Sequence, residues 1–396
     1  MLSDNQPIRL DFLEDKIGLI QEAMRAGGID MWITVTRECN DDPIADDLRI
    51  AGLVEKSAGI ILADGTRSAV VGSFDVDPLK RRGFYHEIRS YSHEGLGPTI
   101  HRFVKDRNPK RIAVNVSVDY SVADGLTSGM REYLVKSLGE YGGRLVSSED
   151  LVIALRGRLI PEEVNLVRQS ISRCERIYSE TEETIKVGTR DKEIHEFMKQ
   201  RTREMNLGLA WEEDMVPTVM IGRNPPSHAA YYNDELRDGD FLRIDFGVKY
   251  QGYCSDIQRV YFVGKGSAPR ELRKMFDTAR AANDAAISAL KPGVSGAQVD
   301  KPAREIVVSS GYPSFPHSTG HAVGRLVHEV GPRLAPFWPE KYGVASEKPI
   351  QENMVFTVEP SIISPLGLCN IEQDVLVTKS GANSISNRQS DLIQIG

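Results

Sequence analysis

Two segments of the sequence each predict a β-hairpin with two carboxylates face to face, and this pattern constrains the fold more than any other feature. In the first segment, residues 240–262, a turn at residues 249–252 would place Asp245 directly opposite Asp256. Opposed side chains on paired strands lie about 4.5–5.5 Å apart, and like charges in that position destabilise a sheet. A cation held between the two carboxylates is the simplest compensation.

The second segment, residues 356–377, repeats this arrangement. The tetrad Ser364–Gly367 has Ser first, Pro second and Gly fourth, which are the preferences of a type I turn. A hairpin closed by this turn would place Glu359 opposite Glu372. Two coincidences of this kind predict a cation site built from four carboxylates.

A histidine cluster lies between the two segments. Three of the eight histidines, His317, His321 and His328, fall within twelve residues that also contain Gly320 and Gly324. Imidazole nitrogen together with carboxylate oxygen suits Mn, Zn, Fe or Co, and two such ions about 3.5–4 Å apart can activate a water and polarise a carbonyl. Taken singly, these residues have plainer roles: a lone Asp next to Gly is usually a turn residue, and Cys254 is a small buried hydrophobe.

The rest of the chain predicts two domains. Up to about residue 155, helical and strand-like segments alternate, which indicates an α/β domain with a mixed sheet. Pro161, followed by two acids, is typical of a helix start. We therefore expect an N-terminal domain over residues 1–155 and an α+β domain over residues 156–396 that holds the carboxylates and the histidine cluster.

Composition excludes several functional classes. The net charge is −7, from 49 basic and 56 acidic residues without a basic block, so nucleic acid and anionic membranes are not expected partners. The four cysteines lie far apart and form no disulfide framework. The acidic start is unlike a signal peptide and no apolar run reaches about 18 residues, so we expect a cytoplasmic protein.

These motifs resemble the creatinase/prolidase/aminopeptidase P superfamily, the pita-bread metallopeptidases. The resemblance covers about residues 155–396, and the N-terminal domain has the size seen in prolidase and aminopeptidase P. The family motifs correspond here to Asp245-Phe-Gly247 with Gly252-Tyr253-Cys-Ser-Asp256, to the histidines at 317, 321 and 328, to Glu359-Pro360, and to Ile371-Glu372.

The resemblance implies a role for each of these residues. Asp245 would bind one divalent metal ion, His321 and Glu359 the other, and Asp256 and Glu372 both; Mn or Zn is expected, with Co as an alternative. Glu359 would also carry the proton of a metal-bridging hydroxide that attacks the Xaa-Pro bond. Three histidines would face the substrate: His228 on the substrate side, His328 at the scissile carbonyl or tetrahedral intermediate, and His317 as a support or substrate contact.

The implied activity is that of an Xaa-Pro dipeptidase, commonly dimeric in this family. The alternatives are an aminopeptidase P acting on longer peptides, a small-molecule C–N hydrolase such as creatinase, and a non-catalytic binding module. Retention of all five ligands disfavours the last two. Three departures from the family pattern concern substrate handling: Ile363 replaces a Tyr, Asn370 an Arg and Gln258 a Thr.

Overall fold

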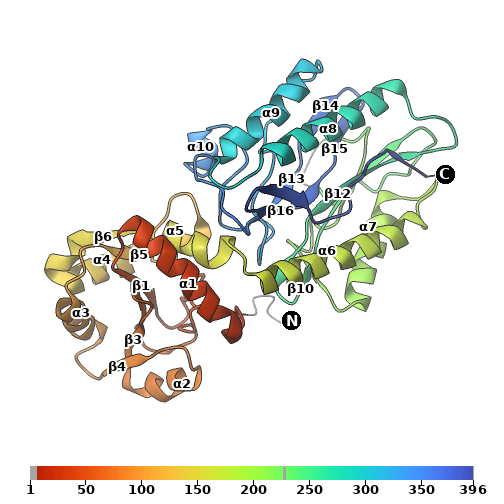
Figure 1. Ribbon diagram of the computed structural model, residues 1–396. Helices are drawn as coiled ribbons and strands as arrows, with labels where there is room; N and C mark the ends of the chain where they lie inside the picture. Colours follow the sequence, from red (N-terminus) through yellow and green to blue (C-terminus); the bar gives the residue numbers. More distant parts are fainter. Residues whose placement is uncertain (1–6, 226–228, 396) are drawn as a thin grey trace. The chain divides into compact units, whose positions relative to one another are not determined.

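The computed structural model describes residues 7–225 and 229–395, which form two compact units, one ending at Arg156 and the other beginning at Gly157. The first unit contains a six-stranded sheet in the order β4-β3-β2-β1-β5-β6 (Figure 1). The β1–β2 and β2–β3 pairs are antiparallel and the other three are parallel, so the predicted mixed sheet is confirmed. Its strands are β1 (Met31–Thr36), β2 (Ser57–Leu62), β3 (Arg67–Gly72), β4 (Glu87–Tyr91), β5 (Ile112–Val114) and β6 (Leu145–Ser147).

Apolar helix faces cover this sheet. Phe103 of α3 and Leu134 of α4 are fully buried in one cluster with Ile33 and Ile60 of the sheet, and Leu79 of α2 belongs to a second cluster. Removal of such apolar area from water stabilises the unit by about 25 cal/mol per Å². The helices are α1 (Leu10–Gly27), α2 (Val76–Arg81), α3 (Leu96–Arg107), α4 (Ser128–Leu138) and α5 (Glu149–Val152).

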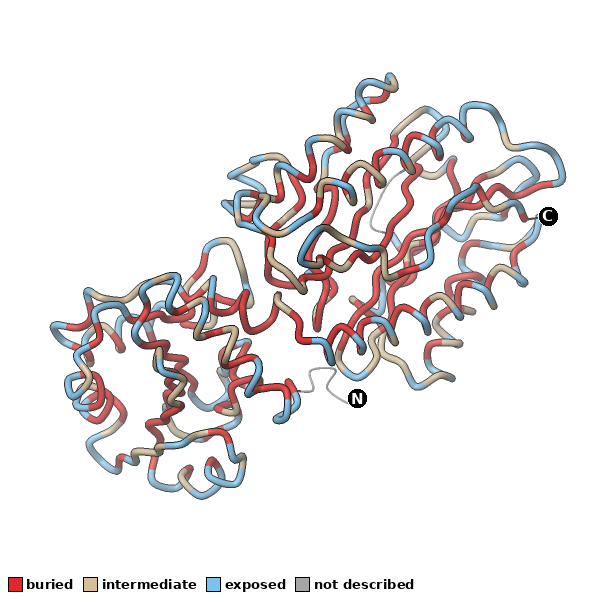
Figure 2. The backbone as a smooth tube through the Cα atoms, in the orientation of Figure 1, coloured by how far each residue is buried: buried red, intermediate tan, exposed pale blue. Residues whose placement is uncertain are grey.

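The second unit is α+β, as expected. Its strands form sheets in the orders β18-β12-β9-β8, β11-β10-β7, β13-β16-β17 and β14-β15. Nearly all residues of the long strands are buried (Figure 2). The strands are β7 (Gly208–Leu209), β8 (Thr218–Ile221), β9 (Phe241–Phe246), β10 (Val248–Tyr250), β11 (Tyr253–Cys254), β12 (Ile257–Val263), β13 (Val355–Val358), β14 (Ser361–Ser364), β15 (Gly367–Asn370), β16 (Gln373–Thr378), β17 (Gly381–Ser384) and β18 (Ile393–Ile395).

Helices of the second unit begin at signals visible in the sequence. Pro161 opens α6, where Glu163 Oε2 accepts a hydrogen bond from the backbone N–H of Ile160, and Ser295 with Gln298 forms the capping box of α9. No helix in the described part of the chain is long and apolar enough to cross a membrane. The helices are α6 (Pro161–Glu182), α7 (Asp191–Glu204), α8 (Arg270–Ala289), α9 (Gly296–Ser309) and α10 (Pro339–Tyr342).

Both predicted hairpins are interrupted, and this positions the candidate ligands. The first divides into β9–β12 and β10–β11, and the second into β13–β16 and β14–β15. Asp256 precedes β12, Glu359 follows β13 and Glu372 precedes β16, so all three lie at interruptions. A residue outside the ladder is free to turn its side chain away from the sheet face, toward a site.

Candidate metal centre

The second hairpin has the predicted register. Val358 pairs with Gln373 in one ladder and Ser361 pairs with Asn370 in the next. Because both ladders share one register, Glu359 lies across from Glu372 at the interruption between them. The turn at Ser364–Gly367 closes this hairpin, with Ser364 paired to Gly367.

The register predicted for the first hairpin is wrong. Tyr250 pairs with Tyr253, and Asp245 pairs with Gln258 instead of Asp256. The loop consists of Gln251 and Gly252, both at positive φ, as in the two-residue turns that match the twist of paired strands. The turn therefore lies one residue later than predicted, and Asp256 lies just before β12, outside the ladder.

The structure nevertheless brings the candidate ligands together. Asp256, His321 and Glu372 each offer a ligand atom within 4.8 Å of the others. The His321 Nε2 atom lies 3.6 Å from Asp256 Oδ2 and 3.5 Å from Glu359 Oε1. Asp245 lies near enough to the same group that, after burial, its charge contributes to the raised pKa of both Asp256 and Glu359.

The electrostatics of this cluster favour a bound cation. Burial, reinforced by the neighbouring carboxylates, raises the pKa of Asp256 and Glu372 well above their usual values and that of Glu359 to about 8. Both carboxylate oxygens of Glu372 are buried without a hydrogen-bond partner in the described residues. Buried charges without partners are costly, so the donor set fits divalent cations, which would satisfy these oxygens.

His321 presents an unprotonated ring nitrogen to the carboxylate cluster. Its Nδ1 atom lies 3.2 Å from the carbonyl oxygen of Ala322, so a proton on Nδ1 leaves the Nε2 lone pair facing Asp256 and Glu359. Burial lowers the pKa of His321 well below its usual range, which keeps the imidazole neutral. Neutral imidazole is the form that binds metals.

The other predicted histidines have different environments. His317 Nδ1 lies 2.7 Å from the carbonyl oxygen of Ser318 and Nε2 lies 2.8 Å from Ser361 Oγ, so both ring nitrogens have protein partners. The exposed His328 packs its ring edge-to-face against His321, with centroids 4.2 Å apart. His228 lies outside the described residues.

Two residues of the site were missed by the sequence analysis. Arg243 lies two positions before Asp245 on β9, and its Nη1 atom is 4.0 Å from Asp245 Oδ2. Asp374 Oδ2 accepts a hydrogen bond of 3.1 Å from the backbone N–H of Asp256. Arg243 could have been suspected from strand alternation, since it lies two positions before Asp245 on the same strand. Asp374 lies two positions after Glu372, but Glu372 is outside β16, so alternation gives no signal there.

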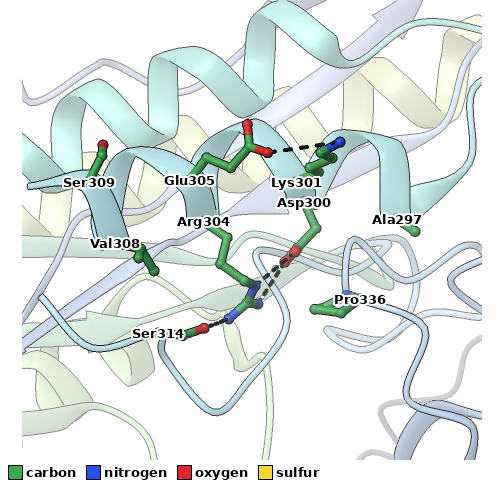
Figure 3. Close-up of a pocket in the computed structure, with 9 residues that line it drawn as sticks. All are labelled: Ala297, Asp300, Lys301, Arg304, Glu305, Val308, Ser309, Ser314 and Pro336. Atoms are coloured by element: carbon green, nitrogen blue, oxygen red, sulfur yellow. Dashed lines mark hydrogen bonds and ion pairs between the residues drawn. The ribbon is translucent and has the colours of Figure 1, made fainter.

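A separate cavity of about 550 Å³ lies over α9 and contains none of the predicted ligands (Figure 3). In its wall, Arg304 forms two hydrogen bonds with Asp300, of 2.9 and 2.7 Å, and donates to the carbonyl oxygens of Phe315 and His317 at 2.6 and 2.9 Å. Asp300 also accepts a hydrogen bond from Thr319. This ion pair therefore fixes the loop that carries His317.

Replacement of this arginine is expected to be strongly destabilising. Arg304→Leu would leave the carboxylate of Asp300, whose side chain is 2% exposed, without its cation. Loss of one partner of a buried pair costs about 3–5 kcal/mol. The neighbouring Lys301–Glu305 pair is exposed, so Lys301→Leu should change the free energy of unfolding by less than about 0.5 kcal/mol. Urea unfolding measures both, and equal effects would contradict a bracing role for Arg304.

Comparison with known proteins places this geometry in a family. The family model described as metallopeptidase family M24 matches residues 165–379. The putative dipeptidase YkvY of Bacillus subtilis is 30% identical over 329 residues, which cover 82% of this chain and 85% of that protein. The Xaa-Pro dipeptidase of Pyrococcus furiosus is 30% identical over 249 residues, covering 62% and 67% of the two chains.

Solved structures agree on the fold. The X-Pro aminopeptidase from Thermotoga maritima MSB8 superposes with a TM-score of 0.67 at 25% identity, covering 94% of this chain and 100% of that one. The dipeptidase PepE from Mycobacterium ulcerans gives a TM-score of 0.74 at 21% identity, covering 98% and 99%. The predicted pita-bread fold is confirmed, and the chain belongs to metallopeptidase family M24.

Proposed function

We propose that this metallopeptidase hydrolyses the Xaa-Pro bond of dipeptides with the help of two divalent metal ions, Mn or Zn, with Co as an alternative. The observation that carries the proposal is the buried group of Asp256, His321 and Glu372, with ligand atoms within 4.8 Å of one another and Glu359 3.5 Å from His321. The Xaa-Pro dipeptidase of Pyrococcus furiosus supports the substrate class by similarity.

Five residues of the chain would hold the ions. Asp245 would bind one ion, His321 and Glu359 the other, and Asp256 and Glu372 both. When bound, the metal ions supply Lewis acidity and lower the pKa of a coordinated water. Asp374 supports this arrangement, because its carboxylate accepts a hydrogen bond from the backbone N–H of Asp256 and so holds the backbone that carries this ligand.

Glu359 would hold and transfer the proton of the attacking water. In the metal-free protein, burial and the charge of Asp245 raise the pKa of Glu359 to about 8. By resemblance to the family, this carboxylate would accept the proton of the water that the metal ions activate. Gln258 Nε2 donates a hydrogen bond of 3.4 Å to Glu359 Oε2. This contact orients the carboxylate so that Oε1 faces His321.

Three histidines complete the proposal. His328, exposed beside His321, would stabilise the oxygen of the tetrahedral intermediate. His317 would support the substrate side of the site, with its ring held by Ser318 and Ser361. The substrate contact of His228, the homodimer and the cytoplasmic location remain predictions.

The test compares Ala-Pro with the tripeptide Ala-Pro-Ala, before and after chelation and with Mn²⁺ or Zn²⁺ added back. Chelator-sensitive cleavage of the dipeptide alone is the expected result. Cleavage of the tripeptide would favour an aminopeptidase, an activity named in the similar Thermotoga maritima structure. No cleavage of either peptide by metal-loaded protein would overturn the proposal and favour a non-peptide C–N substrate, in line with the departures at Ile363 and Asn370.

A further inference from the structure

Arg243 is a buried cation that faces the candidate metal centre. It lies on β9 two residues before Asp245, so both side chains project from the same face of the strand. The residue is 7% exposed, and its Nη1 atom lies 3.1 Å from Gln258 Oε1 and 4.0 Å from Asp245 Oδ2. A guanidinium in this position must act on the carboxylate cluster, on the substrate, or on both.

Gln258 links Arg243 to Asn370 through hydrogen bonds. Position 370 is where many prolidases and aminopeptidases P carry an arginine. Gln258 Oε1 accepts hydrogen bonds from Arg243 Nη1 and from Asn370 Nδ2. Both partners are donors, which leaves the Gln258 Nε2 group to donate to Glu359. The chain therefore has a neutral amide on β15 and a cation on β9, both in contact with one glutamine.

The guanidinium has unused hydrogen-bonding capacity. In the described part of the chain, Nε and Nη2 of Arg243 make no hydrogen bond, and Nη1 contacts only Gln258 and Asp245. A guanidinium presents five N–H donors in a planar fork that matches a carboxylate. Gln258, which accepts from Arg243, also donates to Glu359, so one residue links this guanidinium to the proposed metal site.

We propose that Arg243 is a specificity-determining residue that binds the free carboxylate of a C-terminal proline. The cation then comes from β9, whereas position 370 on β15 is a neutral asparagine. This inference rests on the proposed Xaa-Pro peptidase function. In a dipeptide substrate the carboxylate is attached to the proline ring, so it lies next to the bond that is cleaved. In a longer peptide or an amide this group is uncharged, and the Arg243 contact is lost.

The experiment compares Ala-Pro with its amide, Ala-prolinamide, which differs only in the charged group. We expect kcat/KM to favour Ala-Pro by about 10- to 100-fold, as a charged hydrogen bond provides. Arg243→Leu should reduce this preference to below about 3-fold, mainly through KM for the dipeptide. Adding Asn370→Arg to that variant restores a cation beside Gln258 and should recover part of the preference.

A binding measurement provides a second readout without turnover. Calorimetry on metal-loaded protein should show binding of L-proline and much weaker binding of prolinamide, and Arg243→Leu should lose the difference while its metal content stays unchanged. Arg333→Leu is the matched control, because Arg333 also acts on the charge of Glu359 and His328. It should leave the dipeptide-to-amide ratio unaltered, even if the rates fall.

Each outcome is decisive. Equal cleavage of Ala-Pro and its amide by the unaltered protein would overturn the role of Arg243 and leave the peptidase function intact. A preference that persists in Arg243→Leu would do the same. If Arg243→Leu does not fold, Arg243→Lys replaces it; this variant keeps the charge without the fork, and an unchanged preference for L-proline would then count against the proposal. Silence on both peptides would instead overturn the proposed function, and proline binding would still test Arg243.

Discussion

His321→Ala is expected to lower kcat/KM for an Xaa-Pro dipeptide by about 10³-fold or more, with loss of one of the two metal ions proposed for this site. The imidazole is the nitrogen donor of the cluster, 3.6 Å from Asp256 Oδ2 and 3.5 Å from Glu359 Oε1. Without it, the remaining carboxylates would not hold both proposed ions in a geometry that activates water. Steady-state kinetics combined with metal analysis of the purified variant measures both effects.

The matched control is another buried histidine. His195 on α7 lies outside the cluster, and its Nδ1 atom lies 2.7 Å from the carbonyl oxygen of Pro217. His195→Ala should lower the free energy of unfolding by about 1–3 kcal/mol, because a buried carbonyl loses its partner, while metal content and kcat stay near their original values. If His321→Ala kept two metals and full turnover, the proposed ligand set would be wrong.

The free energy of unfolding of the metal-free protein is expected to fall by at least about 2 kcal/mol between about pH 6.5 and pH 8.5. Burial raises the pKa of Glu359 and of Asp374 to about 8, and those of Asp256 and Glu372 also rise. In this window the unfolded carboxyls are already ionised, whereas the folded ones still hold protons. Rising pH removes these protons and destabilises the folded state.

Divalent metal should reverse this trend, because it binds the ionised carboxylates and so stabilises the folded state more at high pH. Urea unfolding at several pH values, with and without Mn²⁺, measures the effect. Glu372→Gln should flatten the pH dependence of the metal-free protein, whereas Glu305→Gln, at an exposed position on α9, should not. Metal-free stability that rises or stays constant above pH 6.5 would show that the cluster is not held protonated.

The sequence predicted best where local signals decide the structure. The start of α6 at Pro161 was predicted from the proline and the two acids that follow it, because helix-start chemistry acts within one turn. The second hairpin was also predicted correctly, because Pro365 and Gly367 specify the turn and the turn fixes the register. The M24 family membership followed from five ligand-type residues at matching spacing.

The first hairpin shows where local reasoning failed. Its turn contains no proline, and the positive φ of Gln251 is a conformation that non-glycine residues rarely adopt. The turn was therefore placed one residue early, and Asp245 was paired with Asp256 instead of Gln258. The two aspartates still reach one cluster, because Asp256 lies outside the ladder and the unit folds around both.

The sequence by itself determined which residue types are available: four carboxylates and a histidine, in segments whose polar groups are too many to bury without a cation. Only the tertiary structure decided how these groups meet. Neighbours far apart in the chain, such as Asp256 with His321 or Gln258 with Asn370, are brought together by strand pairing and loop packing over distances that no local pattern encodes. Burial in the folded unit then raises the pKa of the carboxyls, because desolvation depends on the folded chain as a whole. The same fold brings Arg243 to within 4.0 Å of Asp245.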